Sequence, residues 1–420
     1  MYDTAEIIAV GTELLLGSIA NTDGQMLSQV LNEAGVSVLY HTVVGDNPAR
    51  LSQAVQTACR RVDLVVITGG LGPTYDDITC RVVSEALGLP LEYRAQAEAD
   101  MRQYFDTMLH PEMPLCNLQQ AWLPRGAEIF RNRVGTAPGC VIETQEATVA
   151  LLPGVPHECR TMAREQLLPW LVGRTGQVIV SRQFRIFGLT EAQVQELLGP
   201  IMDHAVNPSL APYAQTGQVL VRMTARGPSE DACRQLMEPL LPQVRQRLGD
   251  CLYSEDGTSL AGTVVHLLAK AGLTLATAES CTGGLIAKEL TDIPGASAVF
   301  RGGVVSYTNE VKAQVLGVPQ QLLEEYGAVS APVAKAMAEG ARRITGAQLA
   351  ISVTGVAGPD RDDRDNPVGT VFLGLAGPDG VRVRQLALGS GERNYIRILA
   401  ALHALDMVRR EITHTQGQKE

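Results

Sequence analysis

The chain has 420 residues, of which 45% are hydrophobic and 19% are charged, a composition typical of globular domains with buried cores. Its formal net charge is −10, which argues against general nucleic-acid binding, and no apolar run is long enough to predict a membrane span. Its eight cysteines form no CxxC pair and lie at no zinc spacing to histidine, and without a signal-peptide pattern at the N-terminus we expect a cytoplasmic protein.

The first part of the chain alternates apolar strands with amphipathic helices. Strands are predicted at 6–11, 36–44, 63–70 and within 147–162, and helices at 21–35 and 49–62. Because these strands are almost continuously apolar and are separated by helices, we expect an α/β domain with a parallel sheet covered on both faces. Ligands of such sheets bind beyond the carboxyl ends of the strands, where the glycine-rich turns of this chain fall.

The order of the predicted elements changes from residue 173 to 253. Strands at 177–188 and 218–227 alternate with helices at 190–202 and 229–249, which predicts a small α+β domain. The segment 251–262 is interpreted as a hinge to a third domain.

The third domain, residues 254–412, again reads as α/β. The predicted strands are 273–280, 302–307 and 349–355, followed by a hairpin of 369–377 and 381–388. The predicted helices are 261–272, 283–290, 311–317, 331–346 and 394–410. We expect the tail, 413–420, to be frayed.

Ser280 lies where the first strand of this domain ends and where Gly283 and Gly284 are expected to open a helix. The free backbone N–H groups of a helix N-terminus suit either a phosphate or the oxyanion of an acyl-transfer reaction. The alternative is an ordinary serine or threonine helix cap.

Lys312 is expected in the first turn of the next helix. The helix dipole disfavours a cation there, and with partial burial it would lower the lysine pKa toward that of a useful base. A solvated surface lysine is the alternative. Tyr307 and Thr354 also lie at the ends of predicted strands, so we expect all of these side chains on one rim of the sheet.

The histidines of this domain fit a catalytic base less well than the lysine does. His266 and His403 fall within apolar helices, where a packed structural histidine is the simpler interpretation, and His414 falls in the tail. A Ser–Lys pair is therefore favoured over a Ser–His pair.

Five ordered motifs, AESCTGG, GGVVSYTNEVK, TGVAGP, NPVGTVF and GERNYIR, closely resemble the CinA C-terminal family of nicotinamide mononucleotide deamidases. The resemblance implies hydrolysis of nicotinamide mononucleotide to nicotinate mononucleotide and ammonia, without a cofactor. Ser280 would be the nucleophile and Lys312 its base, with Tyr307 and Thr354 orienting the pair or the amide. The oxyanion would be held by the backbone N–H groups of Cys281, Thr282, Gly283 and Gly284.

Two further features of this domain bear on the substrate. By its place in GERNYIR, Arg393 is the candidate for the nucleotide phosphate, and a helix-capping surface arginine is the alternative. The loop DRDDRDN, residues 360–366, is charged and lacks the glycines that this family usually carries there.

The N-terminal part contains a second candidate functional site. Thr68, Gly69, Gly70 and Gly72 form a flexible loop at a strand end, where backbone can approach a phosphate. Asp76 and Asp77 follow, and paired carboxylates beside a phosphate loop suit a divalent metal ion. The start of a helix rich in aspartate is the alternative.

The motifs VGTELLLG, NTDGQMLS, TGGLGPTYDDIT, NRVGTAPG and LLPGVPHE resemble the CinA N-terminal domain, which has the MoaB/MogA-like molybdopterin-binding fold. The resemblance covers residues 1–172 and implies a metal-dependent ADP-ribose pyrophosphatase, with Asp77 matching the carboxylate after the loop. The resemblance places these further residues at the same nucleotide site: Gly11, Thr12, Glu13 and Asn21.

The middle domain resembles the KH-type domain of CinA proteins but shows, from its first predicted strand at 177 onward, no GxxG loop with which RNA-binding KH domains clamp their ligand. We interpret it as a spacer and dimerisation element, and the family resemblance implies a homodimer. The rival interpretation of the whole chain is a competence or DNA-damage accessory protein whose nucleotide sites only regulate partners.

Overall fold

The computed structural model describes residues 2–107, 112–172, 174–175 and 178–417. The parts of our predicted domains that fall on 1, 108–111, 173, 176–177 and 418–420 lie outside the described residues. The chain divides into two compact units, the first comprising 1–181 with 224–238, and the second comprising 182–223 with 239–420. No helix in the described part of the chain is long and apolar enough to cross a membrane.

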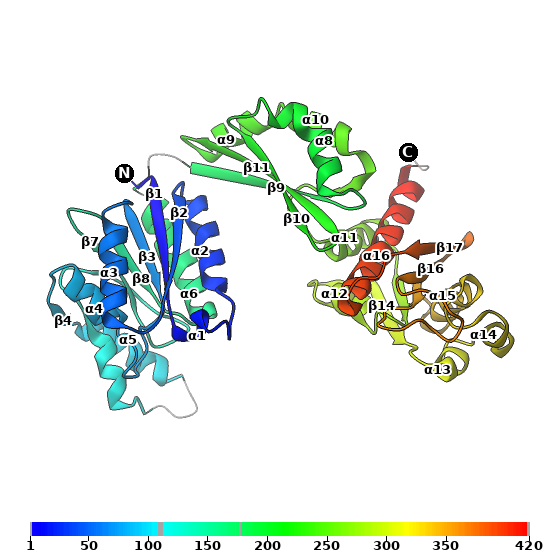
Figure 1. Ribbon diagram of the computed structural model, residues 1–420, viewed down its shortest axis with the longest axis horizontal. Helices are drawn as coiled ribbons and strands as arrows, with labels where there is room; N and C mark the ends of the chain where they lie inside the picture. Colours follow the sequence, from blue (N-terminus) through cyan, green and yellow to red (C-terminus); the bar gives the residue numbers. More distant parts are fainter. Residues whose placement is uncertain (1, 108–111, 173, 176–177, 418–420) are drawn as a thin grey trace. The chain divides into compact units, whose positions relative to one another are not determined.

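The first unit is built on a six-stranded sheet of order β2-β1-β3-β8-β7-β6 (Figure 1). Its strands are β1 Thr4–Val10, β2 Ser37–Val44, β3 Leu64–Thr68, β6 Glu128–Phe130, β7 Gly139–Glu143 and β8 Thr148–Leu152. The first four in the sheet order are parallel, as predicted. The prediction of a parallel sheet does not extend to β7 and β6: β7 pairs antiparallel with β8, because a short turn joins them, and β6 pairs antiparallel with β7.

Helices cover both faces of this sheet, as the apolar strands predict. One face packs against α3 Pro48–Cys59 and α4 Thr79–Ala86, and the other packs against α2 Thr22–Glu33 and α6 Pro156–Met162 (Figure 1). The remaining elements are α1 Thr12–Leu15, α5 Ala95–Phe105, α7 Leu168–Val172, the short helices η1 Leu115–Ala121 and η2 Ala163–Leu167, and a small antiparallel pair of β4 Leu91–Tyr93 and β5 Trp122–Pro124.

The middle domain has a four-stranded sheet of order β10-β11-β9-β12. The strands are β9 Val178–Ile186, β10 Ser209–Gln215, β11 Gln218–Gly227 and β12 Leu252–Ser254. The α+β prediction is confirmed with α8 Glu191–Met202, but the single helix predicted at 229–249 is α9 Glu230–Met237 and α10 Leu241–Leu248. Pro239 lies in the break between them, and Pro242 stands in the first turn of α10, where its missing N–H is tolerated. The expected hinge instead begins with β12, on which Tyr253 is buried.

The C-terminal domain has a five-stranded sheet of order β14-β13-β15-β16-β17. The strands β13 Leu275–Glu279, β14 Phe300–Val305 and β15 Leu349–Gly355 are parallel, and β16 Thr370–Gly377 and β17 Gly380–Ala387 form the predicted hairpin. One face packs against α11 Leu260–Ala271, α12 Leu285–Thr291 and α16 Arg393–Gly417, and the other packs against α14 Gln320–Tyr326 and α15 Ala331–Thr345. The helix α16 continues into the segment where we expected a frayed tail, and α14 was not predicted.

Candidate active sites

Ser280 and Lys312 lie together in the C-terminal domain. Ser280 follows β13, and Lys312 belongs to α13 Asn309–Gln314, which follows β14, the neighbouring parallel strand. The lysine Nζ lies 3.1 Å from the Oγ of Ser280 and donates to the backbone carbonyl of Ser306 at 2.8 Å. Two parallel strands that end at one edge of the sheet thus bring a hydroxyl and an amine within hydrogen-bonding distance.

The environment of Lys312 favours its neutral form. Its side chain is only 1% exposed, so the interpretation as a solvated surface lysine is wrong. Burial lowers the pKa of Lys312 from 10.5 to about 8, because both oxygens that it contacts belong to uncharged groups. An amine that titrates near 8 is suited to accept a proton at neutral or mildly alkaline pH.

The turn that carries Ser280 is closed by a buried carboxylate that sequence reasoning missed. Glu279, which is 1% exposed, accepts hydrogen bonds from the backbone N–H groups of Ile286 at 3.1 Å and Ala287 at 2.8 Å. The Nη2 of Arg397 adds a 2.8 Å bond to the carbonyl of Thr282. An acidic residue shortly before a helix was the one signal that could have identified Glu279.

The helix after Ser280 starts later than predicted. Gly283 and Gly284 have φ values of +60° and +91°, and α12 begins only at Leu285 without a side-chain cap, so the helix-cap interpretation of Ser280 is wrong. The N–H of Gly283 donates to the carbonyl of Ser280 at 3.1 Å and is therefore not free for an oxyanion. Cys281, Thr282 and Gly284 remain the candidate donors of the predicted set.

The other predicted residues of this domain have distinct places. Tyr307 is 57% exposed, and its hydroxyl accepts from the Nη2 of Arg393 at 2.6 Å, while Nη1 of that arginine donates to the Gly358 carbonyl at 2.5 Å. Arg393 is thus fixed at the rim by Tyr307 and by the loop after β15. Thr354 is fully buried and its hydroxyl donates to the Ala328 carbonyl at 2.7 Å, so that hydrogen is not available to the Ser280–Lys312 pair or to an amide.

No histidine takes the place of Lys312 among the contacts of Ser280 that the described residues show. His403 is packed edge-on against Phe187 with ring centroids 4.9 Å apart, and burial lowers its pKa, as expected of a structural histidine. His266 is exposed, so the expectation of a packed ring is wrong there.

The first unit contains a cavity of about 440 Å³ at the carboxyl ends of its parallel strands. Of the predicted nucleotide-binding residues, those that line it are Gly11, Glu13, Asn21, Gly69, Gly70, Gly72, Asp76 and Asp77. Thr12 is not among the residues that line the cavity. Its backbone N–H and its hydroxyl donate to one carboxylate oxygen of Asp46, at 2.9 and 2.7 Å. It thereby orients a carboxylate of the cavity wall.

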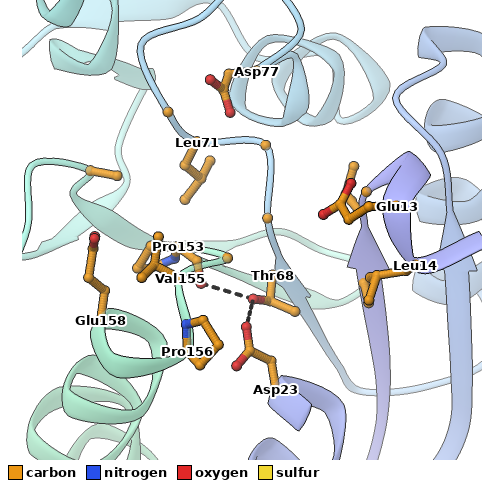
Figure 2. A pocket seen from close by; sticks show the side chains of 18 of the residues that line it. Glu13, Leu14, Asp23, Thr68, Leu71, Asp77, Pro153, Val155, Pro156 and Glu158 are labelled. Atoms are coloured by element: carbon orange, nitrogen blue, oxygen red, sulfur yellow. Dashed lines mark hydrogen bonds between the residues drawn. The ribbon is translucent and has the colours of Figure 1, made fainter. Parts of the chain in front are cut away.

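The cavity is strongly acidic. Its lining, as far as the chain is described, contains six carboxylates and no lysine, arginine or histidine; the six are Glu13, Asp23, Asp46, Asp76, Asp77 and Glu158. Figure 2 shows four of them placed around the opening, among them Asp23 and Glu158, which sequence reasoning missed. Burial raises the pKa of both, although Thr68 contacts Asp23 at 3.3 Å and Asn132 donates to Glu158 at 2.6 Å.

Asp76 and Asp77 converge on one hydroxyl. The Oγ1 of Thr74 lies 2.5 Å from a carboxylate oxygen of each, and the backbone N–H of Thr74 also donates to Asp77 at 2.8 Å. The helix-start interpretation is wrong, since α4 begins at Thr79 without a side-chain cap. Within the described residues no three acidic, histidine or cysteine side chains form a ready-made metal cage. The two carboxylates could supply two oxygen ligands to a divalent ion, whose remaining ligands would have to come from phosphate and water.

Gly69 is required by close packing of this loop. It has a φ of +98°, and a Cβ at this position would lie 2.2 Å from the backbone oxygen of Val10. Gly88 is a matched control, because its φ is also positive, at +68°, but nothing lies within 4 Å of a Cβ there.

We expect Gly88→Ala to lower the free energy of unfolding by about 1 kcal/mol through backbone strain, and Gly69→Ala to lower it by about 3 kcal/mol or more through added overlap. Urea unfolding followed by tryptophan fluorescence measures this, since Trp122 and Trp170, the two tryptophans of the chain, both lie in the first unit. Equal losses in the two variants would contradict the packing argument.

Comparison with known proteins covers all three parts of the chain. The model of the CinA C-terminal domain matches residues 257–412, that of the damage-inducible protein CinA KH domain matches 181–254, and that described as "Probable molybdopterin binding domain" matches 6–172. A competence-damage inducible protein of Acetivibrio thermocellus is 45% identical over 413 residues, which cover 98% of this chain and 100% of the relative.

A second relative and a solved structure also match the chain. A CinA-like protein of Dictyoglomus thermophilum is 40% identical and covers 96% of this chain and 98% of its own length. The crystal structure of the competence/damage inducible protein CihA from Agrobacterium tumefaciens is 41% identical over 37% of this chain and 93% of that chain, with a TM-score of 0.35.

Proposed function

Because this chain belongs to the CinA family, with a MoaB/MogA-like domain, a KH domain and a CinA C-terminal domain, we propose that it is a bifunctional enzyme of pyridine-nucleotide recycling in the cytoplasm. Its C-terminal domain hydrolyses nicotinamide mononucleotide to nicotinate mononucleotide and ammonia. The observation that carries this proposal is the 3.1 Å contact between the buried Nζ of Lys312 and the Oγ of Ser280.

The neutral amine of Lys312 has two N–H groups and one lone pair. One N–H donates to the Ser306 carbonyl, which leaves the lone pair for the hydroxyl hydrogen of Ser280. As the serine oxygen attacks the carboxamide carbon, Lys312 takes its proton, and the carbonyl oxygen becomes an oxyanion facing backbone N–H groups of the turn. Lys312 then protonates the departing nitrogen, so that ammonia leaves and an acyl-enzyme remains. Water hydrolyses this ester, with Lys312 again as the base.

A cationic side chain at the rim, Arg393, supports binding of the nucleotide phosphate. Arg393 uses two of its five N–H donors on Tyr307 and Gly358, so it retains donors for the phosphate of the nucleotide.

The direct test incubates the purified full-length protein with nicotinamide mononucleotide and quantifies both products. We expect one ammonia for each nicotinate mononucleotide, with a rate that rises with pH through about 8 as Lys312 loses its proton. No ammonia at any pH from below to above this value, with or without added metal, would contradict the proposal. It would favour the rival, an accessory protein whose sites only bind nucleotides.

For the N-terminal domain we propose a metal-dependent ADP-ribose pyrophosphatase that yields AMP and ribose 5-phosphate. The supporting observation is the acidic cavity, whose described lining offers a diphosphate no cationic side chain. A divalent ion, held by Asp76, Asp77 and the phosphates, would neutralise the charge of the diphosphate and of its transition state. Burial raises the pKa of Asp23 and Glu158, which suits these two carboxylates to exchange protons with the reacting water or the leaving group.

We expect removal of divalent ions with EDTA to abolish ADP-ribose hydrolysis, because an uncompensated diphosphate is repelled by the carboxylates of the cavity. Ammonia release in the same sample is the internal control and should not change, since the proposed Ser280–Lys312 chemistry needs no metal. Asp77→Ala should lower ADP-ribose turnover at saturating Mg²⁺. Equal rates in the wild type and this variant would remove Asp77 from the mechanism.

The family resemblance also motivates a proposal for assembly. We propose a homodimer in which the middle domain, whose matched residues 181–254 contain no GxxG sequence, contributes to the contact between copies and does not bind RNA.

A further inference from the structure

A second cavity, of about 260 Å³, adjoins the acidic one across the glycine loop of the first unit. The two cavities share five lining residues: Gly70, Leu71, Gly72, Asp77 and Gln120. The loop after β3 is therefore a common wall, and a ligand that lies along it can reach both spaces.

The second cavity is lined by aromatic side chains. Trp122, at the start of β5, is 47% exposed, and Tyr75 of the loop is 96% exposed. The Trp122 ring is held from one side by Tyr93, in an edge-to-face contact with centroids 5.7 Å apart and planes at 65°. Two exposed aromatic side chains that line one cavity together are typical of a ligand or partner site. Trp170, in contrast, is buried and donates to Glu128.

The geometry of the common wall is fixed by two glutamines of η1. The side-chain amide of Gln119 donates to the carbonyls of Gly72 at 3.2 Å and Thr74 at 3.0 Å, and that of Gln120 donates to the carbonyl of Leu71 at 2.9 Å. Because η1 leads directly into β5, these bonds set the position of the loop relative to the start of the strand that carries Trp122.

The two cavities differ in charge. Among the described residues, six carboxylates line the first, whereas the charged residues that line the second are Asp77, on the shared wall, and Arg81. A nucleotide divides in the same way, into a phosphate part that binds with cations and a flat, uncharged ring that stacks on aromatic side chains.

We propose that the second cavity is a base subsite, in which a purine ring stacks on Trp122 while the phosphates of the same nucleotide lie along the glycine loop. The proposal rests on the ADP-ribose activity proposed above and assigns the adenine its place. A purine is the expected occupant because its two fused rings offer a larger stacking face than a single ring.

Tryptophan fluorescence tests this directly, because the chain has two tryptophans and one of them is buried. AMP, in the presence of Mg²⁺, should quench the emission of the wild-type protein in a saturable way, and ribose 5-phosphate, which lacks the base, should not. In Trp122→Phe, which retains Trp170, the AMP-dependent change should vanish. Trp170→Phe is the matched control and should keep it.

Kinetics provide a second readout. Trp122→Ala should raise KM for ADP-ribose roughly tenfold or more through the loss of stacking, with kcat within about twofold of the wild type. If wild-type protein hydrolyses ADP-ribose while AMP leaves the Trp122 emission unchanged, or if Trp122→Ala leaves KM unchanged, the subsite is refuted and the activity stands. If AMP quenches Trp122 but ADP-ribose is not cleaved, the subsite stands and the proposed activity fails.

Discussion

Replacing Ser280 with alanine is expected to lower ammonia release from nicotinamide mononucleotide by about 10³-fold or more. The proposed reaction proceeds through an ester of this hydroxyl, and removal of a nucleophile leaves only what binding and the oxyanion donors contribute. The variant should fold normally, because the Nζ of Lys312 keeps its bond to the Ser306 carbonyl. Initial rates of ammonia release, together with a melting curve, measure both effects.

Ser297→Ala provides the matched control, since Ser297 is an exposed serine of the same domain. It should retain the wild-type rate. A Ser280→Ala protein that releases ammonia within tenfold of this control would show that another group attacks the amide.

Replacing Lys312 with methionine should have two opposite effects. Ammonia release should fall about 10²- to 10⁴-fold, the usual contribution of a general base. The folded protein should become more stable at pH 7 by up to about 3 kcal/mol, because the pKa of Lys312 is lowered from 10.5 to about 8 by burial and each pKa unit corresponds to about 1.4 kcal/mol. Methionine has a similar length and carries no charge into the core.

The pH dependence of stability separates this explanation from a packing effect. Below about pH 8 the lysine is protonated in both states, so the folded protein bears the whole cost of burying the charge. As pH rises from about 8 to 10.5 the folded state has released its proton and the unfolded state still holds it, so wild-type stability should increase across this window. Lys312→Met should lack this increase.

Urea unfolding followed by circular dichroism measures the difference, and the fluorescence of the two tryptophans identifies the transition of the first unit. Lys288→Met is the control, because Lys288 is an exposed lysine of the same domain that pairs with Asp292 at 2.6 Å. It should change neither activity nor the pH profile of stability appreciably. A Lys312→Met protein that is less stable than the wild type at pH 7 would contradict the assigned cost of burial.

The parts of the sites that follow from strand order could be predicted from the sequence. Ser280 and Lys312 each stand just beyond a parallel strand, and the carboxyl ends of such strands meet at one edge, so apolar runs and glycine turns were enough to bring them together. Thr354 satisfies the same pattern, but its hydroxyl is turned to a backbone carbonyl. The sequence pattern places a residue at the end of a strand, but it does not determine the direction in which the side chain points.

Other features depend on contacts between distant segments, which periodicity does not encode. Arg397 reaches the Ser280 turn from α16, and Asn132 reaches Glu158 from a separate loop. The antiparallel strands β6 and β7 are short, and the pairing of β7 with β8 depends on the turn between them rather than on hydrophobic alternation. The acidic cavity shows the same limit, since its carboxylates come from helices and loops far apart in the chain.

The carboxylate of Glu279 ties the start of the Ser280 turn to the beginning of α12 and so closes this stretch of backbone into a small loop. The conformational entropy of the turn is therefore lost once, when the chain folds, and not again each time a substrate arrives. Binding of a ligand therefore does not order this turn further. The amide hydrogens of Ile286 and Ala287 should accordingly exchange with solvent at the same slow rate whether or not a nucleotide is bound.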